Sequence, residues 1–198
     1  MFDEVPPSPP RGLSVRACSA ITGPLLITPR RFGDARGFFC ESFKESWFET
    51  LGISANFVQD NHSLSRAAGV VRGLHFQTAP QAQAKLLRVL KGSVFDVIVD
   101  IRRNSPSYGR SLGVKLDAEN GDQLWVPVGF AHGFATLEPD TEVLYKVTAP
   151  YAPECEGGLF WNDPELDVEW PVAREAAILS ERDSAWPTLA AFHSPFTL

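Results

Sequence analysis

Cysteine is rare in this chain, and its three copies form no functional pattern. Cys18, Cys40 and Cys155 are odd in number and widely spaced, which fits neither a disulfide framework nor a Cys-x-x-Cys site. Unpaired cysteines are typical of reducing compartments. We therefore expect a cytoplasmic protein.

Long apolar segments and clusters of basic residues are also missing. No apolar stretch approaches the ~20 residues of a membrane-spanning helix, and the N-terminus lacks the basic and apolar regions of a signal peptide. The net charge is −6, and no Lys/Arg cluster marks a nucleic-acid footprint. These absences argue against a membrane or a nucleic acid as partner, but they leave room for a local cationic pocket that binds a small anion.

Glycine and proline are plentiful instead, with 15 and 16 copies. Together with many Val, Phe and Leu residues they favour a turn-rich β architecture. A length of 198 residues fits one compact domain. Because prolines crowd the start of the chain, we expect residues 1–16 to be a mobile N-terminal tail and residues 17–198 to be the single domain.

Strand-like segments follow one another at regular spacing. Residues 93–101 alternate, so that Val94, Asp96 and Ile98 share one face, which puts a carboxylate among apolar side chains. Further strands are expected at residues 24–29, 38–42, 112–116, 123–126, 131–137 and 142–148. This spacing predicts an antiparallel sandwich or barrel.

Short helices are expected only outside these strands. Ser42 and Glu45 have the spacing of a capping box, and Gly52 would end the helix that follows. Its apolar face would comprise Phe43, Trp47, Phe48 and Leu51. One or two more short helices are expected after Pro171.

Two segments each place one histidine among apolar and glycine residues, 72–77 and 127–134. The spacing of Gly69, His75 and Gln77, and then of Gly121, Pro127, Gly129 and His132, resembles the two-part signature of a cupin β-barrel. In metal-binding cupins the first part reads His-x-His followed by Glu, but here Gln77 replaces the second histidine and Gln81 or Ala82 the glutamate. A transition metal needs about three or four such protein ligands. The resemblance therefore implies a cupin barrel without a metal or other cofactor, in which a histidine is free to act as a base.

The chain also resembles the dTDP-4-dehydrorhamnose 3,5-epimerase family over most of its length. The matching stretches are residues 32–42, 58–63, 72–77, 84–87, 95–102, 123–134, 144–146, 156–157, 161–163, 169–171 and 179–183. Each alone is weak, but their joint order is specific. The resemblance implies a mainly β, antiparallel jelly-roll or cupin barrel with a few short peripheral helices, a dTDP-sugar substrate and a homodimer. Because prolines flank the strand at residues 23–29, it could form a sheet edge that is swapped between subunits.

The chemistry of such a family sets its own requirements. A C4 ketone acidifies the C3 and C5 protons of the sugar, so inversion needs a base on one face of the ring, a proton donor on the other and a group that stabilises the enolate oxygen. By resemblance His75 is the base, Asp183 orients it and Tyr145 reprotonates the sugar. Lys85 would lie near the developing oxyanion.

A nucleotide diphosphate also needs cations and a surface on which the base can stack. Arg36, Arg72 and Arg182 are the candidates for the phosphates. Phe32 or Phe38 could stack on thymine, while Glu41, Gln59, Asn61 and His132 could contact the rest of the substrate. Arg72 and His75 are three residues apart, so a regular strand would put them on opposite faces unless Gly73 supplies a bulge.

Each of these residues also has an ordinary structural explanation. A histidine in a strand is more often a hydrogen-bonded core residue than a base, and His132 could simply close the turn beside Gly133. Asp183 could start a helix, and Tyr145 could be a core tyrosine. His62 and His193 are interpreted as surface or structural residues.

Three other functions compete with 3,5-epimerisation. A 3-only or 5-only epimerase shares the same motifs. A metal-dependent dioxygenase or isomerase conflicts with the missing ligands. A non-catalytic sugar-binding cupin would be expected to lack His75, Lys85 or Tyr145, and all three are present.

Overall fold

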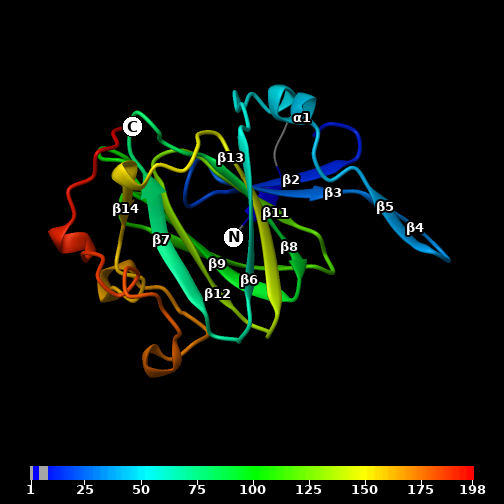
Figure 1. The fold of residues 1–198 in the computed structure, drawn as a ribbon. Helices are drawn as coiled ribbons and strands as arrows, with labels where there is room; N and C mark the ends of the chain where they lie inside the picture. The colour runs from blue at the N-terminus through cyan, green and yellow to red at the C-terminus, as the bar shows by residue number, and fades with distance from the viewer. Residues whose placement is uncertain (1, 5–8) are drawn as a thin grey trace.

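The computed structural model describes residues 2–4 and 9–198, and these form two facing antiparallel β-sheets (Figure 1). Within this part of the chain the larger sheet has seven strands in the order β1-β2-β3-β11-β8-β13-β6, and the smaller has five in the order β10-β9-β12-β7-β14. A separate hairpin, β4–β5, projects from the body. This arrangement is a cupin-type jelly roll, as predicted.

The seven strands predicted from the sequence are present as β3, β5, β9, β10, β11, β12 and β13, each within two residues of the predicted ends. The strand bounds are β1 Phe2–Glu4, β2 Leu13–Cys18, β3 Leu25–Pro29, β4 Arg31–Asp34, β5 Gly37–Cys40, β6 Gln59–Ser65, β7 Val71–Gln77, β8 Lys85–Lys91, β9 Ser93–Asp100, β10 Ser111–Asp117, β11 Gln123–Val126, β12 Phe130–Thr136, β13 Thr141–Val147 and β14 Glu156–Gly158. β9 lies between β10 and β12, and its alternating side chains point to the two faces of the sheet. Val94 and Ile98 join the core between the sheets, while Val97 and Val99 face outward.

The outward faces are buried as well. The C-terminal segment covers the smaller sheet, where Leu159, Phe192 and Phe196 pack against β7, β9 and β12. The larger sheet is covered by α1 (Glu45–Thr50), whose Trp47 and Phe48 are buried. The central strands β9 and β12 are therefore mostly buried, whereas the outer strands β6 and β10 expose some of their residues.

One local prediction is wrong, and two others can be compared with the structure. No capping box forms at Ser42, because α1 begins after Lys44, which makes no side-chain cap. The one or two short helices expected after Pro171 are present as single 3₁₀ turns, η3 (Arg174–Ala176) and η4 (Leu189–Ala191). Two more, η1 (Pro153–Cys155) and η2 (Pro164–Leu166), precede them. The tail predicted for residues 1–16 includes β1 and the first residues of β2, where Val15 packs in one cluster with Trp47 and Phe48. Residues 1 and 5–8 of that tail lie outside the described residues, and its mobility stays a prediction.

The bulge predicted at Gly73 is present. His132 pairs with His75 and Phe134 with Arg72, so two residues of β7 lie opposite Gly133 alone. This extra residue brings His75 and Arg72 to the same side of the sheet. Gly73 has φ +121°, and a Cβ built on it would lie 2.6 Å from the Cα of Gly133. Only glycine fits such an approach.

Replacing Gly73 by alanine should therefore destabilise the protein by more than a positive φ alone explains. Gly12 is the matched control, since it also has a positive φ but a Cβ there would meet nothing within 4 Å. We expect Gly12→Ala to cost about 1–2 kcal/mol in the free energy of unfolding. Gly73→Ala should cost roughly 1–3 kcal/mol more, from overpacking. Chemical denaturation measures both, and equal costs would contradict the close approach.

Candidate active site

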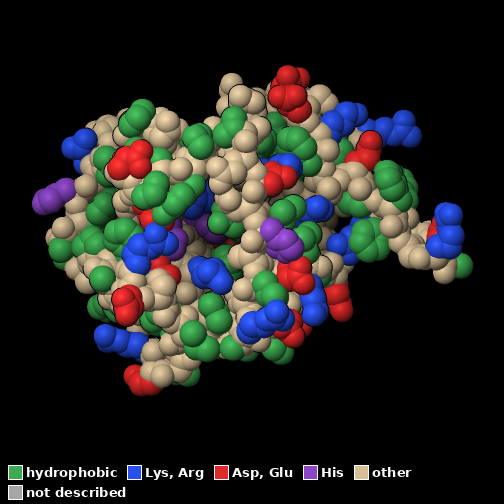
Figure 2. Space-filling view, in the orientation of Figure 1, with side chains coloured by type: hydrophobic (Ala, Val, Ile, Leu, Met, Phe, Trp, Pro, Cys, Tyr) green, Lys and Arg blue, Asp and Glu red, His purple; other side chains and the backbone are tan. Residues whose placement is uncertain are grey.

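A cavity of about 380 Å³ lies between the two sheets. In Figure 2 histidine and basic side chains are visible in a hollow of the face shown. The lining contains nine of the predicted site residues: Gln59, Asn61, Arg72, His75, Lys85, His132, Tyr145, Arg182 and Asp183. The jelly roll thus brings together side chains from β6, β7, β8, β12, β13 and the C-terminal segment.

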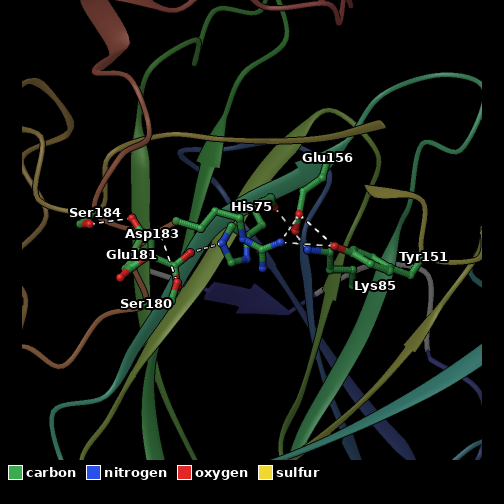
Figure 3. Close-up of polar contacts among 9 residues, drawn as sticks. His75, Lys85, Tyr151, Glu156, Ser180, Glu181, Asp183 and Ser184 are labelled. Atoms are coloured by element: carbon green, nitrogen blue, oxygen red, sulfur yellow. Dashed lines mark hydrogen bonds and ion pairs between the residues drawn. The ribbon is translucent and has the colours of Figure 1, made fainter. Parts of the chain in front are cut away.

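His75 and Asp183 form a hydrogen-bonded pair in this cavity (Figure 3). The Nε2 atom of His75 bonds to Asp183, and the hydroxyl of Ser180 donates to the second carboxylate oxygen over 2.9 Å. Burial favours the neutral form of Asp183, but the hydrogen bond and charge of His75 outweigh it and hold the pKa of Asp183 below its ordinary value. Asp183 therefore stays ionised and can both orient the imidazole and stabilise its protonated form.

Lys85 contacts the backbone of His75. Its Nζ donates to the backbone oxygen of His75 over 3.3 Å. Burial lowers the pKa of Lys85 to about 8, although the charges of Asp96 and Glu156 oppose the shift. Lys85 is therefore mostly cationic at neutral pH and loses its charge in a moderately alkaline solution.

Asp96 and His132 form a second buried pair. The Nε2 atom of His132 lies 3.0 Å from both carboxylate oxygens of Asp96, a residue with no exposed surface. Burial raises the pKa of Asp96, opposed by the charges of His132 and Lys85. Asp96 was not among the site residues predicted from the sequence. Its signal was the carboxylate between Val94 and Ile98, since such a group is buried only when it is paired.

Tyr145 approaches the cavity from the opposite sheet. It lies on β13, whereas His75 lies on β7, so the two side chains line the same cavity from facing walls. Burial raises the pKa of Tyr145; nearby Arg72 opposes this, while Glu156 and Tyr151 reinforce it. The phenol hydroxyl is therefore protonated at neutral pH and can donate a proton.

Tyr151 and Glu156, which were not predicted as site residues, lie at the mouth of the cavity. The guanidinium of Arg182 bonds to Glu156 and lies 3.3 Å from the hydroxyl of Tyr151, and that hydroxyl donates to Glu156 over 3.1 Å (Figure 3). Tyr151 is half exposed. Neither residue had a distinctive spacing in the sequence, because their loop is positioned by contacts with distant strands.

Gln77 is one of those contacts. Its side-chain oxygen accepts from the backbone N–H of Ala152 at 3.0 Å, and its nitrogen donates to the backbone oxygens of Pro150 and Gln81. The side-chain oxygen of Gln59 accepts from the N–H of Tyr151 at 3.2 Å. The residue that takes the place of a metal-binding histidine thus holds the loop that carries Tyr151.

Four predicted substrate contacts do not reach this cavity. Phe32, Arg36 and Phe38 belong to the projecting hairpin, and Glu41 follows it. The side chain of Arg36 is 90% exposed and pairs only with its neighbour Asp34 among the described residues. These residues cannot contact a ligand bound in the cavity of their own chain, because the hairpin extends away from it (Figure 1).

The remaining histidines agree with their predicted surface or structural roles. His62 pairs with Glu142 at the surface, and His193 is exposed.

Among residues 2–4 and 9–198 no group of three or more His, Cys, Asp and Glu side chains is arranged to hold a metal ion. In the same residues no helix is long and apolar enough to cross a membrane.

Comparison with known proteins bears on this site. A family model described as dTDP-4-dehydrorhamnose 3,5-epimerase matches residues 18–191. A protein of that name from Sinorhizobium fredii is 54% identical over 164 residues, which cover 83% of this chain and 84% of the relative. A crystal structure from Bacillus anthracis, with TDP and PPi bound, superposes with a TM-score of 0.85 at 48% identity and covers 89% of this chain and 99% of that one.

A second solved structure extends the likeness to a sugar complex. The enzyme from Legionella pneumophila, in complex with dTDP-4-keto-L-rhamnose, has a TM-score of 0.86 and 44% identity, over 91% of this chain and 95% of that chain. The residues that the family model matches include β3 to β14 and the C-terminal segment that carries Asp183. The resemblance seen in the sequence is confirmed, and the chain belongs to the dTDP-4-dehydrorhamnose 3,5-epimerase family.

Proposed function

We propose that this protein epimerises a dTDP-4-keto-6-deoxyhexose at C3 and C5. One observation carries the proposal: a base supported by a carboxylate and a protonated phenol face one cavity from opposite sheets. A sugar ring bound between them would present one face to His75 and the other to Tyr145. Inversion requires such access from both faces.

The first step is removal of the proton next to the ketone. Since the Nε2–H of His75 donates to Asp183, its Nδ1 carries the free electron pair that accepts the proton. The C–H electron pair moves into the ring and leaves an enolate oxygen. Lys85 supplies the cation that stabilises this oxygen, and His132, held by Asp96, lines the same space.

The second step delivers a proton to the other face. Tyr145 donates its hydroxyl proton to the enolate carbon and recovers a proton from solvent, while His75 releases the abstracted one. Repeating both steps at the second carbon gives the double epimer. Arg72 and Arg182 are positioned to bind the diphosphate near the mouth, with Gln59, Asn61 and Tyr151 beside them.

Solvent exchange tests this function. Incubated with dTDP-4-keto-6-deoxyglucose in D₂O, the protein should introduce deuterium at both C3 and C5, as followed by NMR. The rate should be unchanged by EDTA, because the proposed chemistry uses no metal. Deuterium at one carbon alone would indicate a 3-only or 5-only epimerase, and the absence of exchange a sugar-binding protein. Loss of activity on chelation and its recovery with added metal would overturn the metal-free mechanism.

Two variants separate the roles in the same assay. His75→Ala should abolish exchange and turnover together, because the base that forms the enolate is gone. Tyr145→Phe removes only the donor hydroxyl, so it should retain proton abstraction while net inversion falls roughly 10²–10⁴-fold. Equal loss of exchange in both variants would show that Tyr145 positions the substrate and that another group donates the proton.

Activity should also decline as the pH rises through about 8, where buried Lys85 loses its charge. Because burial lowers this pKa, the cation is present below about 8 and lost above it. Lys85→Gln should reduce kcat by roughly 10²–10³-fold, as for other groups that stabilise an oxyanion. Lys85→Arg keeps a charge at all accessible pH values. Its rate should be lower, but its pH profile should lack the decline near 8; an unchanged decline would assign it to another group.

A homodimer would complete the substrate site. Phe32, Phe38 and Phe39 are 50%, 61% and 66% exposed on the projecting hairpin, and such a cluster of exposed aromatics is typical of a protein interface. Arg36 lies at the end of the same hairpin. We therefore propose that the hairpin of one subunit reaches the cavity of a second copy and supplies the contacts that its own cavity lacks.

Subunit complementation tests this assembly. Arg36→Ala and His75→Ala homodimers should both be impaired. A heterodimer purified with two different tags contains one site with both residues intact, so it should recover about half of the wild-type activity. An inactive heterodimer, or a protein that is monomeric by light scattering, would contradict the exchange of hairpins.

A further inference from the structure

We propose that Trp186 is a positioning residue that holds Asp183 against His75. The inference rests on the proposed function, in which His75 is the base. Trp186 is partly buried and does not line the cavity. It therefore acts on the reaction through the His75–Asp183 pair and makes no contact with the substrate.

The indole lies on the strand next to His75. Gly158 of β14 pairs directly with His75 of β7. A Cβ built on Gly158 would lie 2.5 Å from Cδ2 and Cε2 of Trp186, so the ring rests on the bare backbone of this glycine. The ring centroids of Trp186 and His75 are 6.2 Å apart, and the rings meet edge to face. The indole thus contacts both the strand pair and the neighbourhood of the imidazole.

The turn that carries Asp183 is anchored on either side. Upstream, the N–H of Val71 donates to the oxygen of Ile178 at 2.9 Å, at the start of β7. Downstream, the N–H of Phe160 donates to the oxygen of Pro187 at 2.8 Å, just after β14. Trp186 precedes this second anchor and sits three residues after Asp183. Its contact with Gly158 therefore sets how closely the turn approaches the strands.

The contact between Trp186 and Gly158 depends on the flat shape of the ring and on no hydrogen bond. The Nε1 atom of Trp186 is buried, and it has no hydrogen-bond partner among the described residues. A phenyl ring would keep the flat surface that rests on Gly158 and would lose no hydrogen bond. This gives a matched pair of variants, Trp186→Phe and Trp186→Ala.

A double-mutant cycle with Asp183→Asn tests the inference. Trp186→Ala should lower kcat and deuterium exchange by up to about 100-fold, the scale for a displaced catalytic group, with KM changed little. Trp186→Phe should stay close to wild type. In the Asp183→Asn background, Trp186→Ala should add almost no further loss, because the carboxylate it positions is already gone. Equal losses in both backgrounds, or Trp186→Phe as impaired as Trp186→Ala, would overturn the proposal.

A second measurement is independent of turnover. The His75 proton shared with Asp183 should give a downfield imidazole resonance in ¹H NMR, assigned by its loss in Asp183→Asn. Trp186→Ala should weaken or shift it, and Trp186→Phe should preserve it. If the resonance is unchanged in Trp186→Ala, the positioning role fails even where the enzyme is active. If wild type shows the resonance but no exchange with the keto sugar, the proposed function fails and the positioning role stands.

Discussion

The close approach of β7 and β12 is the constraint on which the site depends. Gly73 and Gly133 lie against each other where one extra residue enters β7. In a regular strand Arg72 and His75 would point to opposite faces, so only one of the two side chains could line the cavity. The bulge removes that conflict, and no side chain larger than a hydrogen fits at its centre.

Buried charge is the second condition, and the molecule meets it by pairing. His75 bonds to Asp183, and His132 to Asp96, while Lys85 lies between the two pairs with its pKa lowered by burial. Unpaired, each of these groups would be costly between two apolar sheets. In this arrangement His75 can accept a proton next to the cationic Lys85, which can stabilise an enolate oxygen. The phenol of Tyr145 stays neutral on the facing wall. Burial alone favours the neutral forms of Asp183 and Lys85, and the contact with His75 keeps Asp183 ionised. For Tyr145, burial itself favours the protonated form that the proposed mechanism needs.

The hairpin β4–β5 lies outside both sheets, and Arg31 ties its base to the body by donating to the backbone oxygens of Ala118 and Glu119. It exposes aromatic and basic side chains and lies away from the cavity, whereas every other strand packs into one of the two sheets. Its exposed aromatic side chains support the proposal that the hairpin packs against a second subunit. The loop around Tyr151 shows the opposite case: Gln59 and Gln77 hold it in place from distant strands, so the mouth of the cavity is already formed in one chain.

The sequence alone determined the strand positions, the burial of their alternating residues and the family. Hydrophobic alternation is a local property, and so β9, β11 and β13 were predicted within a residue or so at each end. The tertiary structure decided what depends on contacts between distant segments. It paired Asp96 with His132, brought Asp183 to His75, and set Tyr151 and Trp186 beside the cavity. It also placed Arg36 and the aromatic hairpin outside it, because the direction of a hairpin follows from packing that no local pattern encodes.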